Sequence, residues 1–424
     1  MALSNQTKQR VTHTPKKSHS TNLISVIIPN YNHGQYIIDA IDSILRQDYH
    51  NYEIIVIDDG STDNTGKIVA KYGDKVNYIW QENQGLSAAR NHGIRLAKGD
   101  FIALLDADDI YEPDFMSTLI DILQQNPSAD GIFCGYQFVD NVDIPLPGGE
   151  ARSISANQLY DVLLDGNFLV PESILIRRYC YEAVGPFDES LRACEDWDMW
   201  LRISKQYQII GTDKILTRHR VLPGSMSTDP IRMLNNRLTV LEKHFGSLTG
   251  SSADWTLQKR KAYGYGYLTS CVEYLQYQDI DRAYECFRKM VEVYPDLLTT
   301  LSTYYELGCG NQPKGFRGHF PSLDVQYNAK ILFKLLETLF SDGQIPKTII
   351  AYRKQAYADA NMALGMLSYG AGDLPSARKF LGSAIMTDPK FGFNRTVATT
   401  LLKSMLGTKL LHYLKPNQQP LVTQ

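Results

Sequence analysis

The stretch ISVIIPNYN at residues 24–32 decides the fold class, because it joins a short β-branched run to a polar end. Its length and composition predict a buried strand that Pro29 stops. Further buried strands are predicted at residues 53–57, 76–80 and 101–105, with helical segments between them. Strands that alternate with helices favour an α/β fold, with a mainly parallel sheet covered by helices.

Polar side chains follow three of these predicted strands directly. Asn30, Tyr31 and Asn32 follow the first strand, Asp58-Asp59 the second, and the run DADD at residues 106–109 the fourth. Open α/β sheets bind ligands just beyond the carboxyl ends of their strands. These residues are therefore expected to form one site.

The pair Asp106 and Asp108 has the composition of a cation site. Two carboxylates one residue apart present oxygen ligands to a hard divalent ion and leave positions for water and phosphate. Such an ion could stabilise a departing diphosphate. Taken alone, an Asp-x-Asp pair is more often a pair of solvated loop acids, so its surroundings decide.

The surroundings resemble the nucleotide-binding half of family 2 glycosyltransferases. The resemblance covers residues 23–228, about half the chain, and rests on motifs in the family's order: SVIIPNYN at 25–32, IVIDDGSTD at 55–63, NQGLSAARN at 83–91, LDADD at 105–109, VGPFDE at 184–189 and EDWDMWLR at 195–202. It implies the GT-A fold and an inverting transfer of sugar from a nucleotide-diphosphate sugar to an acceptor hydroxyl.

The same resemblance implies a set of nucleotide-binding residues. Asp59 would bond the nucleobase, uracil by expectation, while the backbone around Pro29 with Tyr31 packs on that base. Asp106 would lie near the ribose. Arg90 would either hold the nucleotide or form a structural ion pair under the sheet.

The metal assignment also follows from the resemblance. Asp108, together with Asp106, would bind Mn²⁺ or Mg²⁺ with the diphosphate, and Arg220 would contact the diphosphate. The family often has a histidine just before Pro-Gly-Ser, where this chain has Leu222. His219 could replace that ligand through a loop shift, or the metal lacks it.

Asp196 is the candidate general base. Inversion needs a carboxylate that removes the acceptor proton, and repulsion from the adjacent Glu195 can raise a pKa toward neutrality. Glu195 and Asp198 are the next candidates. Trp197 and Trp200 follow helical spacing and are predicted core residues, although stacking on an acceptor sugar stays open.

Two rival functions remain on the sequence alone. A nucleotidyltransferase would show a glycine-rich phosphate loop after the first strand, whereas this chain has one glycine there, Gly34. A non-catalytic scaffold would use helical repeats for binding and a vestigial sheet domain. The joint presence of Asp59, Asp108 and Asp196 speaks against such decay.

The composition of the chain limits which partners and which cellular location are expected. The 424 residues predict two or three domains, and a net charge of −3 favours no nucleic-acid partner. The six cysteines lack metal-ligand spacing and are predicted to be buried thiols of a reducing cytosol. The sequence contains no signal peptide and no spanning segment, so the enzyme is expected in the cytoplasm, with the inner membrane face as a peripheral site.

The second half of the chain is predicted to be helical. Residues 259–295 and 350–389 each resemble a tetratricopeptide-type helix pair, with a generic bundle as the alternative. Such surfaces suit a glycan, lipid-linked or protein acceptor, or a protein partner. The predicted domains are a disordered tail at 1–22, the GT-A domain at 23–235, a linker at 236–258, the helical region at 259–396, and an amphipathic helix with tail at 397–424. That last helix either caps the repeats or rests on an anionic membrane.

Overall fold

A computed structural model describes residues 22–250 and 252–406 of the chain. The described chain divides into two compact units, Met1–Val240 and Leu241–Gln424, whose described parts we treat separately. The division lies inside helix α8 (Pro230–Phe245), which runs past the predicted domain end at residue 235. The residues before 22 and after 406, which include most of the predicted tails, lie outside the described parts.

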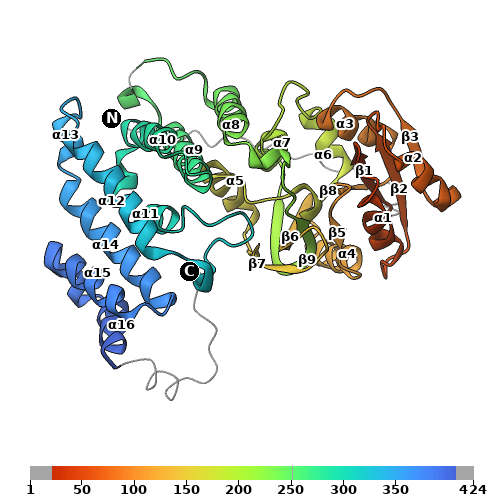
Figure 1. Ribbon diagram of the computed structural model, residues 1–424. Helices are drawn as coiled ribbons and strands as arrows, with labels where there is room; N and C mark the ends of the chain where they lie inside the picture. The colour runs from red at the N-terminus through yellow and green to blue at the C-terminus, as the bar shows by residue number, and fades with distance from the viewer. Residues whose placement is uncertain (1–21, 251, 407–424) are drawn as a thin grey trace. The chain divides into compact units, whose positions relative to one another are not determined.

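The first unit is built on a nine-stranded sheet in the order β3-β2-β1-β4-β8-β6-β9-β5, with β7 paired to β6 (Figure 1). The strands are β1 (Ile24–Asn30), β2 (Tyr52–Asp58), β3 (Asn77–Trp80), β4 (Phe101–Leu104), β5 (Ile110–Tyr111), β6 (Gly131–Val139), β7 (Pro145–Glu150), β8 (Ile174–Arg177) and β9 (Ile209–Arg220). This is the GT-A type of fold that the motifs predicted.

The sheet is mixed rather than mainly parallel. Strands β1 to β4 pair in parallel, as expected from their alternation with helices. Beyond β4, the pairs β4–β8, β8–β6, β6–β7 and β9–β5 are antiparallel, and β6–β9 alone is parallel. A short connection such as that between β6 and β7 can only return the chain antiparallel, whereas a parallel neighbour needs a long crossover.

Strand β1 runs one residue past Pro29, which was predicted to stop it. Pro29 pairs in register with Ile57 of β2. On the other side, the register with β4 ends at Ile27 opposite Leu104. Proline cannot donate to a sheet ladder, and it stands here where only one neighbouring strand remains.

Helices cover the sheet on both faces. Ile24, Val26 and Ile28 pack in one core with α1 (Ile37–Leu45) and α4 (Phe115–Gln125). On the other face, a Cβ added to Gly93 of α3 (Leu86–Leu96) would lie 2.3 Å from Ile27, so glycine permits this close approach. The remaining helices of this unit are α2 (Thr65–Val69), α5 (Ala156–Asp165), α6 (Arg178–Val184) and α7 (Glu195–Ser204).

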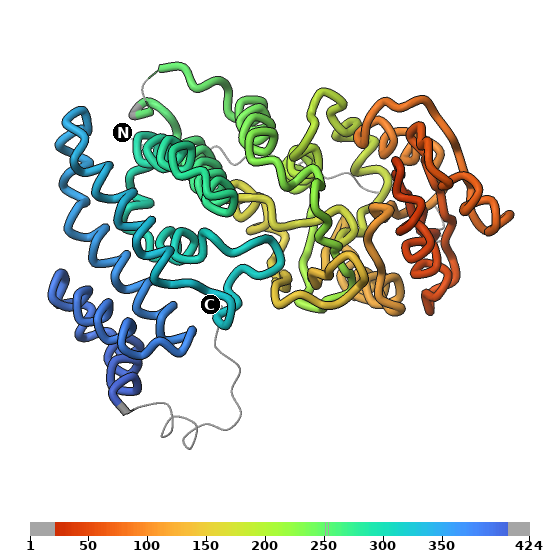
Figure 2. The backbone as a smooth tube through the Cα atoms, viewed as in Figure 1, coloured from red at the N-terminus to blue at the C-terminus, as the bar shows by residue number. Residues whose placement is uncertain are grey.

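The second unit is helical, as predicted. Figure 2 shows its chain reversing between successive helices. They are α9 (Leu257–Gln276), α10 (Ile280–Val293), α11 (Leu301–Gly308), α12 (Val325–Ser341), α13 (Lys347–Ile350), α14 (Arg353–Gly370), α15 (Leu374–Thr387) and α16 (Arg395–Leu406).

The two predicted helix pairs are α9–α10 and α14–α15, and they share local features. Asp279 caps α10 by accepting from Arg282 N, and Asp373 caps α15 by accepting from Ser376 N. In each pair a glycine of the first helix, Gly264 or Gly365, lies against large side chains. The tetratricopeptide assignment itself stays a prediction.

Helix α16 packs Val397 and Leu401 against the helical core of the second unit. Val397 and Ser404 are buried, whereas Leu402 and Met405 are about 60% exposed. Arg378 of α15 donates to the Ser404 carbonyl oxygen, at 2.6 Å, which ties α16 to its neighbour. The predicted continuation to Leu414 lies outside the described residues. In the described chain, helices both apolar enough and long enough to span a bilayer are absent.

Candidate active site

Sheet pairing brings the three predicted polar strand ends together. Strand β1 lies between β2 and β4, with Asn30 opposite Asp58 and Ile27 opposite Leu104. The turn that carries Asp106, Asp108 and Asp109 follows β4 immediately. In open α/β sheets, ligands bind in a crevice at the carboxyl ends of the strands, at the point where the strand order reverses. The strand pairing places the three strand ends at one edge of the sheet, and their role as one site stays a prediction.

Asp59 lies in a tight cradle of donors. It is buried and accepts hydrogen bonds from Gln81 Nε2 at 2.6 Å and from the backbone N–H groups of Gln84, at 2.9 Å, and Gly85, at 2.7 Å. The amide oxygen of Gln81 lies 2.7 Å from His92 Nδ1. These contacts fix the carboxylate's orientation. Of the base-packing candidates, Pro29 is the penultimate residue of the buried strand β1, and Tyr31, just after the strand, is half exposed.

Arg90 forms a buried bridge between two predicted catalytic segments. Its guanidinium is 1% exposed and bonds Asp106 through Nη2 (2.8 Å) and Glu195 through Nη1 (2.6 Å). The Phe187 ring lies 5.6 Å from its Cζ. Burial alone would lower the pKa of Arg90, but the charges of Asp106 and Glu195 raise it above its usual value. These contacts favour the structural ion pair over direct nucleotide binding.

Among the acids of the turn, Asp108 has the fewest contacts that offset the negative charge of its carboxylate. Burial, followed by the neighbouring Asp109 and Asp106, raises its pKa to about 7. His33 Nδ1, from the loop after β1, lies 3.8 Å away. A site that disfavours the carboxylate's own charge suits a divalent cation, which would relieve the repulsion. The oxygen donors Asp108 and Asp106 fit Mn²⁺ or Mg²⁺, with Asp106 already shared with Arg90.

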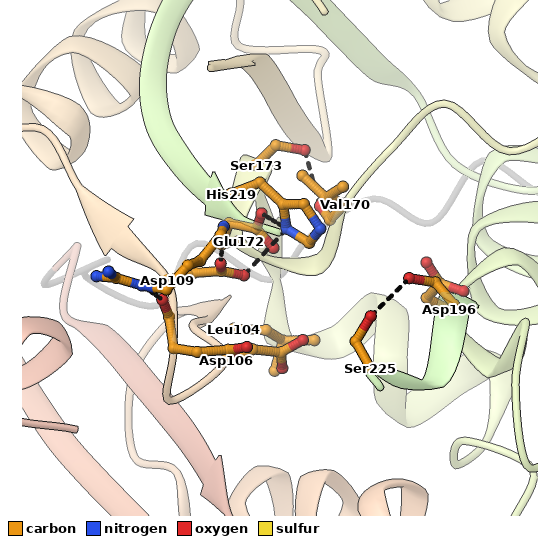
Figure 3. A network of polar contacts seen from close by, with 12 residues as sticks. Leu104, Asp106, Asp109, Val170, Glu172, Ser173, Asp196, His219 and Ser225 are labelled. Carbon is orange, nitrogen blue, oxygen red and sulfur yellow. Dashed lines mark hydrogen bonds and ion pairs between the residues drawn. The ribbon is translucent and has the colours of Figure 1, made fainter. Parts of the chain in front are cut away.

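His219 faces a different pair of acids from the one predicted. Its Nδ1 lies 2.8 Å from Glu172 Oε1 and 3.2 Å from Asp109 Oδ2. Figure 3 shows the His219 ring directed at both acids. Asp109 and Glu172 are both buried, and burial with the charge of Glu172 raises the pKa of Asp109 to about 7. The ligand atoms of the three residues lie within 4.8 Å of one another.

Arg220 is buried and its guanidinium is engaged. Nε donates to the Asp108 carbonyl oxygen (2.8 Å), and Nη1 donates to the Asn141 carbonyl oxygen (3.0 Å). Nη2 lies 3.2 Å from Asp39 Oδ2, and the Tyr36 ring lies 4.9 Å from Cζ. In this arrangement Arg220 fixes the turn of Asp108. A diphosphate contact would need a rearrangement of the side chain.

Asp196 lies at the start of α7, opposite the turn of Asp106 in Figure 3. Asn167 Nδ2 donates to its Oδ2 at 2.8 Å, and Ser225 points toward it. Burial, followed by the charge of Glu195, raises its pKa to about 7. Cys194, just before the helix, has a left-handed backbone (φ 59°) that turns the chain into α7.

The other residues of α7 are structural. Trp197 and Trp200 are buried, and Trp197 Nε1 donates to the Leu163 carbonyl oxygen at 2.8 Å, which confirms their prediction as core. Asp198 is buried and paired with Arg202 at 2.9 Å, which removes it as an alternative base.

Sequence reasoning missed four residues of the site. They are His33, Gln81, Asn167 and Glu172. His33 and Gln81 adjoin quoted motifs, so their position at strand ends could have marked them. Asn167 and Glu172 lie in a loop and a short helical turn whose sequence carries no signal of this kind.

Comparison with known proteins adds the family context. Residues 25–183 match the family model described as glycosyl transferase family 2. An uncharacterized glycosyltransferase of Rickettsia typhi is 36% identical over 52% of this chain and 70% of that protein. The chondroitin synthase of Escherichia coli is 28% identical over 59% of this chain and 36% of that enzyme. A crystal structure of S. aureus TarS 1–349 with UDP-GlcNAc aligns over 79% of this chain and 90% of that one, with 17% identity and a TM-score of 0.47.

Proposed function

The chain belongs to glycosyltransferase family 2, and we propose that it is an inverting, metal-dependent enzyme that transfers a sugar from a UDP-linked donor to an acceptor hydroxyl. The proposal concerns the mechanism, the donor and the metal. Family membership alone sets none of them.

The observation that carries the proposal is the buried bridge Asp106–Arg90–Glu195. Arg90 neutralises one acid of each pair, Asp106 of the pair Asp106 and Asp108 in the turn, and Glu195 of the pair Glu195 and Asp196 at the helix start. Their neighbours Asp108 and Asp196 keep raised pKa values. The bridge therefore holds Asp108 and Asp196 in fixed positions relative to each other. In the proposal, Asp108 serves the donor's cation and Asp196 serves the acceptor.

On the donor side, Asp59 would bond the uracil and Tyr31 would pack on it. Gln81 keeps the Asp59 carboxylate in place. Asp108 would bind Mn²⁺ or Mg²⁺, with Asp106 beside it toward the ribose. The cation, when bound, would offset the negative charge of the leaving diphosphate. Arg220 supports this end of the site by holding the Asp108 backbone.

On the acceptor side, Asp196 would remove the proton of the attacking hydroxyl. Asn167 orients its carboxylate through the 2.8 Å hydrogen bond. A base with a pKa near neutrality takes up a proton readily and is still ionised in part at neutral pH. Attack opposite the departing diphosphate inverts the anomeric centre.

The acceptor is proposed to be a glycan, lipid-linked sugar or protein, in the synthesis of a surface polysaccharide, glycolipid or glycoprotein. The helical unit would position it or bind a protein partner. Action at the cytoplasmic face of a membrane, by peripheral contact, is also part of the proposal. It rests on the leucines and lysines near the C-terminal end of the sequence.

The first test is the substitution Asp108→Asn. We expect the variant to lose the Mn²⁺-dependent part of UDP binding and to stay folded, because it removes a cation ligand and a buried repulsion. Titration calorimetry with UDP, with and without Mn²⁺, measures both affinities. The matched control is Asp74→Asn, at an exposed acid of the same unit.

Equal Mn²⁺ dependence in Asp108→Asn and wild type would refute the metal assignment. A panel of nucleotide sugars, screened for hydrolysis and for thermal protection, tests the donor. Protection by guanosine-linked donors instead of UDP-linked ones would overturn the uracil assignment.

A further inference from the structure

Three side chains from separate elements, two buried carboxylates and one partly exposed histidine, meet at the turn of residues 106–109. Asp109 comes from the turn after β4, Glu172 from the short 3-10 helix at Pro171–Ser173, and His219 from β9. Asp109 is 1% exposed and Glu172 is fully buried. His219 Nδ1 lies within hydrogen-bond distance of both carboxylates, at 2.8 Å and 3.2 Å. When both carboxyl groups are ionised they can only accept, and an Nδ1–H group is then the donor of these bonds.

This cluster is connected directly to the residue proposed to bind the cation. The second oxygen of Asp109 accepts from the backbone N–H of Arg220 at 2.7 Å. Arg220 Nε in turn donates to the Asp108 carbonyl oxygen at 2.8 Å. Strand β9 thus contacts the turn through two successive residues, His219 and Arg220. Glu172 is the outermost member of the chain of contacts, and it touches the turn through His219.

A contribution to folding stability does not explain why a glutamate is buried at position 172. Its Oε2 is buried and has no hydrogen-bond partner in the described structure. A buried carboxylate with an unsatisfied oxygen is costly, and apolar replacements of buried ionic groups are often neutral or stabilising. The burial of Glu172 therefore indicates a role other than stability. Its contacts lead to the turn of residues 106–109, which carries Asp108.

We propose that Glu172 is a positioning residue, which orients His219 and through it Asp109, and so fixes the turn that presents Asp108 to the divalent cation. The proposal deepens the proposed function and rests on the cation-binding role of Asp108. Partners in the outer shell of metal ligands typically change metal affinity about 10–100-fold when they are replaced.

The test is the Mn²⁺ affinity of full-length Glu172→Gln in the presence of UDP, measured by titration calorimetry. We expect Mn²⁺ to bind about 10–100-fold more weakly than in wild type. UDP affinity without metal should be unchanged, and the melting temperature should be unchanged or higher. The control is Glu182→Gln, an exposed acid paired with Arg178 in the same unit.

A second pair of variants tests the same path if Glu172→Gln fails to fold. His219→Asn keeps an N–H donor near the position of Nδ1, whereas His219→Ala removes it. We expect the alanine variant to lose more Mn²⁺ affinity than the asparagine variant. Wild-type Mn²⁺ affinity in His219→Ala or in folded Glu172→Gln would overturn the proposal.

Three further results separate this inference from its premise. If Asp108→Asn keeps its Mn²⁺ affinity, the metal role of Asp108 fails and this inference fails with it. If Asp108→Asn loses that affinity and Glu172→Gln does not, only the positioning role fails. A second Mn²⁺ per chain that survives Asp108→Asn and disappears in Glu172→Gln would make the cluster itself a metal site and overturn positioning.

Discussion

At the residue scale, the carboxylates of this site differ in their partners. Asp106 and Glu195 share one buried guanidinium. Asp108, two positions after Asp106, and Asp196, directly after Glu195, have pKa values raised to about 7 by burial and by neighbouring acids. Opposed environments of adjacent acids are the usual way in which one site obtains different chemical roles. One arginine therefore pairs with two of the four acids, and the other two are the ones proposed for the cation and the acceptor.

The prediction at this scale concerns Asp196. Asp196→Asn should lower the turnover number about 10²–10⁴-fold and leave UDP binding unchanged, because the base touches the acceptor and not the nucleotide. In wild type, a base with a pKa near 7 is protonated below that pH, so turnover should rise as pH increases through about 7 and level off above it. Transfer assays between pH 5 and 9 measure both effects.

The comparison variant is Asp213→Asn, an exposed acid on β9, which should keep the wild-type rate and pH profile. Near-normal turnover in Asp196→Asn would move the base to another residue. Glu195, which is bound to Arg90, would then be the first to examine.

At the element scale, the helix pairs of the second unit depend on glycine at their contact. Gly365 of α14 faces Leu381 of α15, and a Cβ added there would lie 2.7 Å from the leucine side chain. Gly382 lies in α15 with open space at its Cβ position. The two glycines thus differ in packing while both are helical.

This contrast gives a matched pair of substitutions. Gly365→Ala should lower the free energy of unfolding by about 1–3 kcal/mol, because it overpacks the contact between α14 and α15. Gly382→Ala should raise it by about 0.5–1 kcal/mol, because alanine costs less backbone entropy in a helix. Urea denaturation of both variants measures the difference. A stabilising Gly365→Ala would show that the two helices approach less closely than described.

At the scale of the whole molecule, the chain divides into a sheet unit and a helical unit. The residues proposed for donor, cation and base all belong to the first unit. Strand β9, the last one in the described chain, ends at Arg220. None of these proposed residues lies in the helical unit, for which we propose a role toward the acceptor or a partner.

The prediction at this scale is a truncation. A chain ending at residue 246, just after α8, should bind UDP and Mn²⁺ with wild-type affinity and transfer poorly to the natural acceptor. Calorimetry and transfer assays on the two lengths measure this. Normal transfer by the shorter chain would refute an acceptor role for the helical unit. Liposome flotation of the full chain and of one ending near residue 396 tests membrane contact.

The sequence by itself determined the features that depend on local pattern. Buried strands, helix pairs and the polar ends of β1, β2 and β4 follow from the order of apolar and polar residues along short stretches. The burial of Trp197 and Trp200 follows from helical spacing in the same way. These predictions required no knowledge of distant contacts.

Only the tertiary structure decided which charges meet. Arg90 bonds Glu195, and Glu172 bonds His219, across loops and strands that separate them widely in sequence. The mixed pairing beyond β4 likewise depends on how long connections return to the sheet. Burial and charge pairing are properties of the assembled fold. The sequence alone therefore does not distinguish an Asp or Arg that binds a ligand from one that forms a structural ion pair beside it.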